Sequence, residues 1–167
     1  KKPLFMETRP TSIKYMGLGN ILNLSKGLKR SKVILHLDHG DYRTAKKCIQ
    51  KGYPSVMFDG SSLSLRQNIK KTKKIVKLAH QNNVFVEAEI GMLEKDGLTD
   101  PNEAKTFAEQ TGIDILAVSV GNQHGYYKYA PVIDIERLIE IKRNVSVPLV
   151  LHGASGLDDS IIKEALK

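Results

Sequence analysis

The chain has 167 residues and a formal net charge of +8, with 26 lysines and arginines against 18 acidic residues. This length supports one domain with a sizeable core, and the apolar and charged fractions are ordinary for a globular protein. The single cysteine, Cys48, excludes an internal disulfide and a cysteine-based zinc finger. We therefore expect a reducing, cytoplasmic setting.

Two interpretations of the basic charge compete. A positively charged surface attracts nucleic acid or a small polyanion. The alternative is that the lysines are solvated on helix surfaces, which is favoured by the lysine-rich segment 70–74, where no aromatic residue is interleaved. We therefore expect no nucleic-acid partner. No apolar run approaches the roughly 20 residues of a membrane span, so we expect no membrane partner either.

Short β-rich segments alternate with amphipathic helical segments along the chain. The expected strands are the segments 4–7, 33–38, 55–59, 84–90, 115–120 and 148–152. Their nearly continuous apolar runs are typical of parallel strands that are covered on both faces. Between them, apolar residues recur at helical spacing, as in the segment 65–79.

Capping residues mark the expected helix boundaries. Asp100, followed by a proline, predicts a helix start, and Gly112 predicts its end. Asp134 predicts another start, and Asp158 or Asp159 begins the last helix. The repeated β–α order implies a parallel sheet, either closed as a barrel or open as a doubly wound sheet. The glycine-rich fingerprint of a dinucleotide-binding fold is missing from the sequence.

Three histidines lie at the carboxyl ends of three different expected strands. His39, His124 and His152 each precede a glycine, which lets a loop backbone approach a ligand closely. In a barrel, this rim of the sheet carries the catalytic residues. A catalytic zinc uses three protein ligands and leaves a fourth position open, so a three-histidine set suits it. A single histidine at a strand end is more often an ordinary hydrogen-bonded residue, and the pattern alone leaves both interpretations open.

Carboxylates accompany these histidines. Asp38 shares a strand face with His36, Glu87 and Glu89 share a face of a later strand, and Asp59 ends another strand. Buried carboxylates are costly unless they are paired or bound to a cation. Their candidate roles are a second metal site, orientation of a histidine, or acid–base catalysis. The alternative is an ordinary polar layer with lysine partners.

A loop before the last expected helix has the composition of an anion site. The segment 153–156 reads Gly-Ala-Ser-Gly, and its backbone amides are suited to bind an anion. Lys128, four residues after His124, adds a positive charge. Beside a metal site, these features suggest a phosphorylated substrate.

Five motifs together resemble the signature of class II fructose-bisphosphate and tagatose-bisphosphate aldolases. They are His-Leu-Asp-His-Gly at 36–40, Ser-Val-Met-Phe-Asp-Gly-Ser at 55–61, Val-Glu-Ala-Glu-Ile-Gly at 86–91, Gly-Asn-Gln-His-Gly at 121–125 and Pro-Leu-Val-Leu-His-Gly-Ala-Ser-Gly at 148–156. The motifs occur in the family's order and with nearly its spacing. The resemblance implies an α/β fold, a (β/α)8 TIM barrel, of which this chain holds about strands 2 to 7 in one domain over residues 1–167.

The resemblance also implies roles for individual residues. His39, His124 and His152 would ligate a catalytic Zn²⁺, and Asp38 would take the proton from the C4 hydroxyl of the substrate. Two further residues match positions that bind a second or displaced metal ion, namely Glu89 and Asp59. Residues that match contacts to a substrate phosphate or a monovalent cation are Gly125, Lys128, Gly153 and Ser155.

The activity that the resemblance implies is the reversible aldol cleavage of fructose or tagatose 1,6-bisphosphate to dihydroxyacetone phosphate and glyceraldehyde 3-phosphate. Zinc, acting as a Lewis acid, would stabilise the enediolate. The protein would then be a zinc-dependent lyase of glycolysis, and a homodimer or homotetramer. The alternative is a non-catalytic or altered-substrate relative that binds a sugar phosphate.

Three departures from the family pattern stand out. Where relatives have Ser-Glu-Gly after the second strand, this chain reads Arg9-Pro10-Thr11, which points to a changed phosphate contact or a changed substrate. The segment 92–99 is shorter than the family's mobile loop, which carries a proton-transfer glutamate. The family's first and eighth strands have no counterpart here. We therefore expect a chain that lacks N-terminal and C-terminal portions and part of the loop near 92–99.

Overall fold

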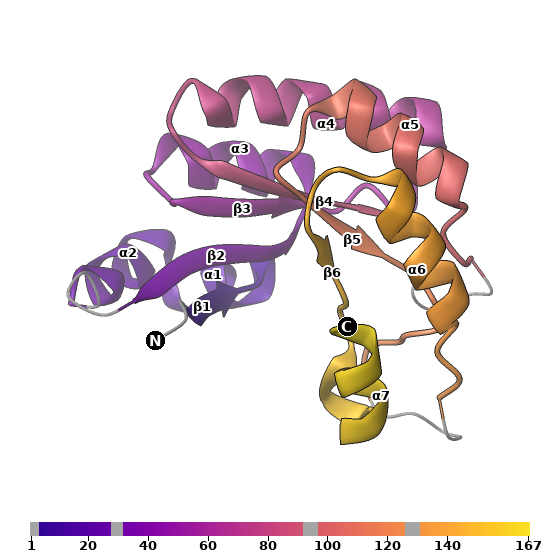
Figure 1. The fold of residues 1–167 in the computed structure, drawn as a ribbon. Coiled ribbons are helices and arrows are strands. Elements are labelled where there is room, and N and C mark those ends of the chain that lie inside the picture. Colours follow the sequence, from indigo (N-terminus) through magenta and orange to yellow (C-terminus); the bar gives the residue numbers. More distant parts are fainter. Residues whose placement is uncertain (1–3, 28–31, 92–96, 126–130) are drawn as a thin grey trace.

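The fold is seen in a computed structural model, which describes residues 4–27, 32–91, 97–125 and 131–167 (Figure 1). Six strands form one parallel sheet in the order β1-β2-β3-β4-β5-β6. The strands are β1 (Leu4–Thr8), β2 (Val33–Gly40), β3 (Ser55–Phe58), β4 (Phe85–Ile90), β5 (Ile115–Val118) and β6 (Leu149–Val150). Each strand pairs with its neighbour in sequence, whereas a doubly wound sheet reverses its strand order at a switch point.

Helices connect successive strands, and the last helical segments follow β6. They are α1 (Pro10–Met16), α2 (Leu18–Lys26), α3 (Tyr42–Gln50), α4 (Leu65–His80), α5 (Pro101–Thr111), α6 (Ile135–Asn144), a short 3-10 helix η1 (Ala154–Gly156) and α7 (Asp159–Ala165). The sheet curls, and α3 to α6 lie on the outer side of the curl (Figure 1). This arrangement is a half-barrel, and it confirms the expected incomplete (β/α)8 barrel. Among the described residues, no helix has the length and apolar character needed to cross a membrane.

The capping residues set the helix boundaries as the sequence predicts. The Asp100 side chain accepts hydrogen bonds from two backbone N–H groups at the start of α5, and Gly112 ends that helix in the left-handed region, with φ 70°. The Asp134 side chain likewise caps α6. Asp158 is the residue that precedes α7. The last strand is shorter than expected, since only Leu149–Val150 is in strand conformation.

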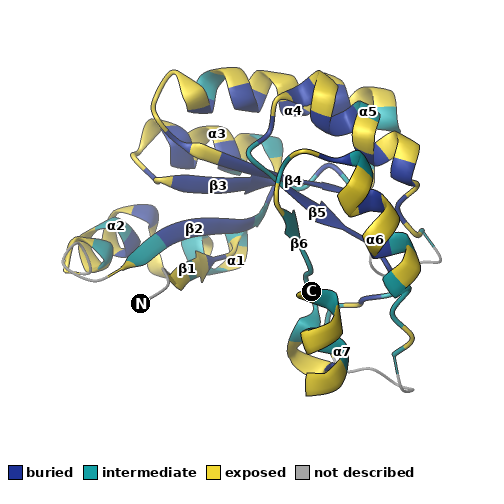
Figure 2. Cartoon of the chain, viewed as in Figure 1, coloured by how far each residue is buried: buried dark blue, intermediate teal, exposed yellow. Residues whose placement is uncertain are grey.

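Alternation along the strands separates the core from the site. The strands β3 and β5 are almost entirely buried (Figure 2). Their residues Val56 and Leu116, together with Val86 of β4, belong to the face that packs against the helices, and all three are fully buried. The intervening positions of β4 turn to the interior of the curl, and their polar side chains, Glu87 and Glu89, are buried there. The polar face of the sheet therefore carries the candidate chemistry.

An irregularity in β2 changes which residues face the interior. β2 pairs with β3 at Leu37 opposite Val56, and the register has shifted where pairing resumes at Gly40. His39, within this irregular stretch, has φ 46°, which is uncommon for a residue other than glycine. We predicted that His39 falls just past the strand, but it lies within β2. The shift lets Asp38 and His39 face the same space although they are consecutive.

Candidate active site

Three histidines from three strand ends meet at the carboxyl edge of the sheet. The ring of His39 lies 4.5 Å from the ring of His124 and 4.7 Å from that of His152, measured between centroids. The rings of His124 and His152 are 6.0 Å apart. His39 belongs to β2, whereas the other two follow β5 and β6. The structure thus brings together the three imidazoles on which the metal hypothesis depends.

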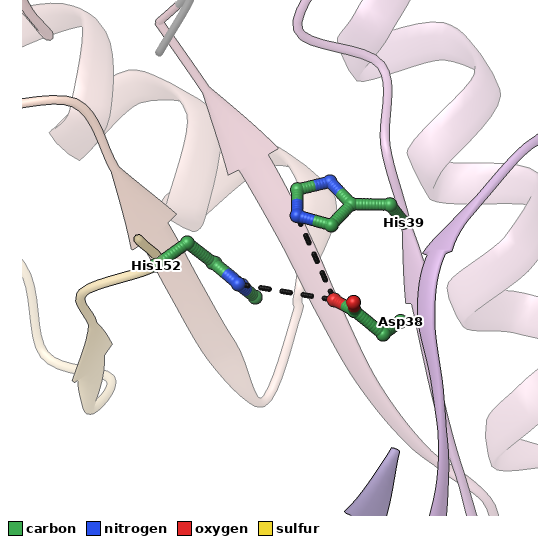
Figure 3. Close-up of side chains that lie close together, drawn as sticks. All are labelled: Asp38, His39 and His152. Carbon is green, nitrogen blue, oxygen red and sulfur yellow. Dashed lines mark ion pairs between the residues drawn. The ribbon is translucent and has the colours of Figure 1, made fainter. Parts of the chain in front are cut away.

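The carboxylate of Asp38 faces two of these rings (Figure 3). Its Oδ1 atom is 3.6 Å from His39 Nε2 and 3.8 Å from His152 Nδ1. These three residues form one group whose donor atoms all lie within 4.8 Å of one another. A second such group contains His39, Asp59 and Glu89. His124 belongs to neither group, although its ring is the nearest imidazole to that of His39.

Several donor atoms in this space are buried and have no hydrogen-bond partner among the described residues. They are Asp38 Oδ1, His39 Nε2, Glu89 Oε2 and His124 Nε2. Buried polar atoms in folded proteins are almost always satisfied. A divalent cation accepts electron pairs from imidazole nitrogen and carboxylate oxygen alike. The residues present therefore fit a metal ion.

Two carboxylates each contact one ring nitrogen of a histidine, the nitrogen that points away from the shared space. Glu87 Oε1 lies 2.7 Å from His152 Nε2, and Asp59 Oδ2 lies 2.7 Å from His39 Nδ1. A carboxylate on one ring nitrogen fixes the orientation of the ring, so that the other nitrogen faces the shared space. The sequence left several candidate roles open for Glu87. In the structure its carboxylate contacts His152, which is the arrangement expected of a residue that orients a histidine.

Burial and neighbouring charges give the carboxylates different acidities. Burial, together with the negative charge of Asp59, raises the pKa of Glu89 to about 8. Burial opposes the charged form of Asp59 too, but hydrogen bonds from His39 and Ser61 outweigh it and lower its pKa to about 2. At neutral pH, Asp59 is therefore ionised, while Glu89 needs a nearby cation to be fully ionised.

Burial and neighbouring charges also shift the pKa values of the histidines in different directions. Burial lowers the pKa of His124, and the positive charge of His39 adds to this effect. Burial also disfavours the charged form of His152, but the hydrogen bond and the negative charge of Glu87 outweigh it and raise its pKa. A neutral imidazole is the form that binds a metal ion.

The site opens into a cavity of about 690 Å³. Its lining residues are Glu7, Arg9, Asp38, His124, Gly125, His152, Gly153, Ser155 and Gly156. The expected phosphate contacts Gly125, Gly153 and Ser155 thus share one space with Asp38, whereas Lys128 lies outside the described residues. A Cβ atom on Gly153 would come within 2.0 Å of the carbonyl oxygen of Gln123, so only glycine fits there.

Sequence reasoning missed two contacts that shape the site. The buried Asn122 side chain accepts a hydrogen bond from the N–H of Val120 and donates one to the carbonyl oxygen of His152, which ties the loop after β5 to the end of β6. Arg9 donates from Nε to Asp38 Oδ2 over 2.8 Å. Asn122, close to a strand-end histidine, and Arg9, which departs from the expected motif, were visible in the sequence, but their hydrogen-bond partners were not.

Comparison with known proteins identifies the family. A family model described as class-II fructose-bisphosphate aldolase matches residues 1–167. The chain belongs to this family. The resemblance that the five motifs indicated is thereby confirmed.

Individual proteins similar to this class II aldolase chain are also named aldolases. It is 40% identical over 182 residues to the fructose-bisphosphate aldolase of Helicobacter pylori, a match that covers 98% of the chain and 59% of the relative. The solved structure of the YdjI aldolase from Escherichia coli has a TM-score of 0.90 and 35% identity, with 99% of this chain and 62% of that chain covered. A fructose-bisphosphate aldolase from Campylobacter jejuni shares the fold, with a TM-score of 0.75, 23% identity and coverage of 99% and 60%. The chain therefore spans about three fifths of the length of these relatives.

Proposed function

We propose that the protein is a zinc-dependent aldolase, which cleaves fructose or tagatose 1,6-bisphosphate reversibly to dihydroxyacetone phosphate and glyceraldehyde 3-phosphate. Membership of the class II aldolase family supports the reaction type. The observation that carries the proposal is the convergence of three imidazoles from separate strand ends beside the buried carboxylate of Asp38. Three protein ligands and an open position suit a catalytic zinc.

In this proposal, three ring nitrogens hold the ion, namely His39 Nε2, His124 Nε2 and His152 Nδ1. A zinc ion there supplies the Lewis acidity that stabilises the negative charge left next to a carbonyl when a carbon–carbon bond breaks. Glu87 and Asp59 keep two of the rings in the orientation that binding requires. The group of His39, Asp59 and Glu89 is the candidate for a second cation.

Asp38 is the proposed acid–base residue. Its Oδ1 atom faces the histidine cluster without a hydrogen-bond partner among the described residues, so it can accept the proton of the C4 hydroxyl during cleavage and return it during synthesis. Arg9 holds the other oxygen, which keeps the carboxylate from rotating. The proposed contacts to the substrate phosphate are Gly125, Gly153 and Ser155 on the cavity wall, with Lys128 beyond the described residues.

A second candidate function is supported by one observation. Arg9 lies where the resemblance to the family implies a serine, and its guanidinium contacts the proposed base Asp38 directly. An altered-substrate relative, or one that binds a sugar phosphate without turnover, would accommodate this change. The intact set of Asp38 and three converging histidines favours the catalytic candidate.

Cleavage of each bisphosphate, with and without a chelator, tests the proposal. We expect turnover to be lost when metal is removed and to return with zinc. Activity that survives complete removal of metal would contradict a zinc-dependent mechanism. Metal binding without turnover on either sugar would instead favour the binding protein. The homodimer or homotetramer and the cytoplasmic setting stay predictions.

A further inference from the structure

The backbone fixes the position of Arg9 at the rim of the sheet. Arg9 directly follows β1 and directly precedes α1, whose first residue is Pro10. Its backbone is extended, with φ −87° and ψ 162°, and its carbonyl oxygen accepts a hydrogen bond from the N–H of Ile13. Proline at the first helical position is pre-organised for the helix. The strand and the helix therefore hold Arg9 from both sides, and its side chain lines the cavity.

The contact between Arg9 and Asp38 engages only part of the guanidinium. The bond runs from Nε to Asp38 Oδ2 over 2.8 Å. A guanidinium carries five N–H donors in one plane, and four of them are on the terminal nitrogens. The Arg9 side chain is 48% exposed although the carboxylate it contacts is buried. The terminal nitrogens are therefore accessible to a ligand in the cavity.

Asp38 contacts both Arg9 and the histidine cluster. Its Oδ2 atom binds Arg9, whereas its Oδ1 atom is turned toward His39 and His152. The glycine-rich loop that contains Ser155 follows β6, and Arg9 follows β1, so the two come from opposite edges of the sheet and line one cavity. A ligand in this cavity can therefore contact the loop, Asp38 and Arg9 together.

We propose that Arg9 is a specificity-determining residue, which binds an anionic group on the aldehyde-derived half of the substrate. This inference rests on the proposed function, in which Asp38 takes the proton from the hydroxyl of C4, the first carbon of that half. The anionic group is a carboxylate or a phosphate monoester, because the planar donors of arginine match both.

Aldehydes of different charge test this inference in the direction of bond formation, with dihydroxyacetone phosphate as the donor. The acceptors are glyceraldehyde, which is neutral, glyceraldehyde 3-phosphate, and tartronate semialdehyde, in which a carboxylate replaces the terminal hydroxymethyl group. For Arg9→Gln, we expect kcat/KM to fall about 10- to 100-fold more for an anionic acceptor than for glyceraldehyde, mainly through KM, because hydrogen bonds between charged groups are lost. A loss confined to the phosphate or to the carboxylate identifies the group that Arg9 binds. An equal loss for all three acceptors, or no loss, overturns the proposal.

Arg43→Gln is the matched control, because Arg43 is exposed on α3 and does not line the cavity. It removes the same charge and should leave the ratios between acceptors unchanged. Calorimetric titration of glycerate and of glycerol 3-phosphate into the metal-loaded, full-length protein, with the donor site saturated by dihydroxyacetone phosphate, gives a readout that does not depend on turnover. We expect at least one of the two to bind about tenfold more weakly to Arg9→Gln than to the wild type. Equal binding of both overturns the inference about Arg9, whereas a wild-type protein without any aldol turnover contradicts the proposed function instead.

Discussion

The contact between Glu87 and His152 gives a quantitative prediction for Glu87→Gln. The carboxylate lies 2.7 Å from His152 Nε2, and Glu87 is 5% exposed, so water replaces this contact poorly. Glutamine has nearly the same shape but no negative charge. A hydrogen bond that involves a charged group contributes about 1.5–3 kcal/mol, and one between neutral groups about 0.5–1.5 kcal/mol. The difference, about 1–1.5 kcal/mol, predicts metal binding about tenfold weaker than in the wild type.

Competition with a chromogenic chelator at a series of chelator concentrations measures this change. Glu109→Gln is the matched control, because Glu109 is exposed on α5, and its metal affinity should equal that of the wild type. Thermal unfolding of the metal-free variants establishes that Glu87→Gln remains folded. An affinity for Glu87→Gln within about twofold of the wild type would refute the reasoning that the charge of Glu87 orients and polarises His152.

Three further predictions concern the remaining parts of the site. Asp38→Ala should abolish turnover and leave the metal content of the purified protein unchanged, since the proposed ligands are intact; residual wild-type turnover would contradict the acid–base role. Loss of a residue that only contacts a metal ligand typically weakens metal binding about 10- to 100-fold. His124→Ala should weaken it more than that, and full metal occupancy of this variant after dialysis would show that His124 is not a ligand. Gly153→Ala should lower the free energy of unfolding in urea more than Gly52→Ala, because both have positive φ but only Gly153 would bring a Cβ atom against a backbone carbonyl; equal losses would exclude the steric cause.

Much of the fold followed from local signals in the sequence. Apolar runs marked the strands, and the caps at Asp100 and Asp134 placed two helix starts correctly because a side chain can satisfy a backbone N–H within its own turn. Parallel strands align their carboxyl ends, so histidines that follow different strands had to reach the same edge. These inferences needed only the order of the elements and no knowledge of the curl of the sheet.

The pairing of carboxylates with histidines was not accessible in this way. Glu87 meets His152, which lies 65 residues away in sequence. The curl brings β4 and the end of β6 around one interior, and side-chain alternation cannot say which partner a carboxylate finds there. The shift in β2 is a second example, because alternation alone turns His39 away from the face that Asp38 occupies. Side-chain contacts across a curved sheet depend on its curvature and register, neither of which is local.

The arrangement of acidic groups around His39 is costly for a protein that only has to fold. Glu89 and Asp59 both approach His39 Nδ1, and only Asp59 makes the short hydrogen bond. Burial and the charge of its neighbour raise the pKa of Glu89 to about 8, so its ionisation in the folded chain is unfavourable at neutral pH. Apolar residues of similar volume would avoid this cost, and they would remove the buried polar atoms that have no hydrogen-bond partner within the described part of the chain. A cation that binds the folded site better than the unfolded chain offsets the same cost through its binding free energy. The clustering is therefore better explained by a ligand that the site binds than by the stability of the barrel.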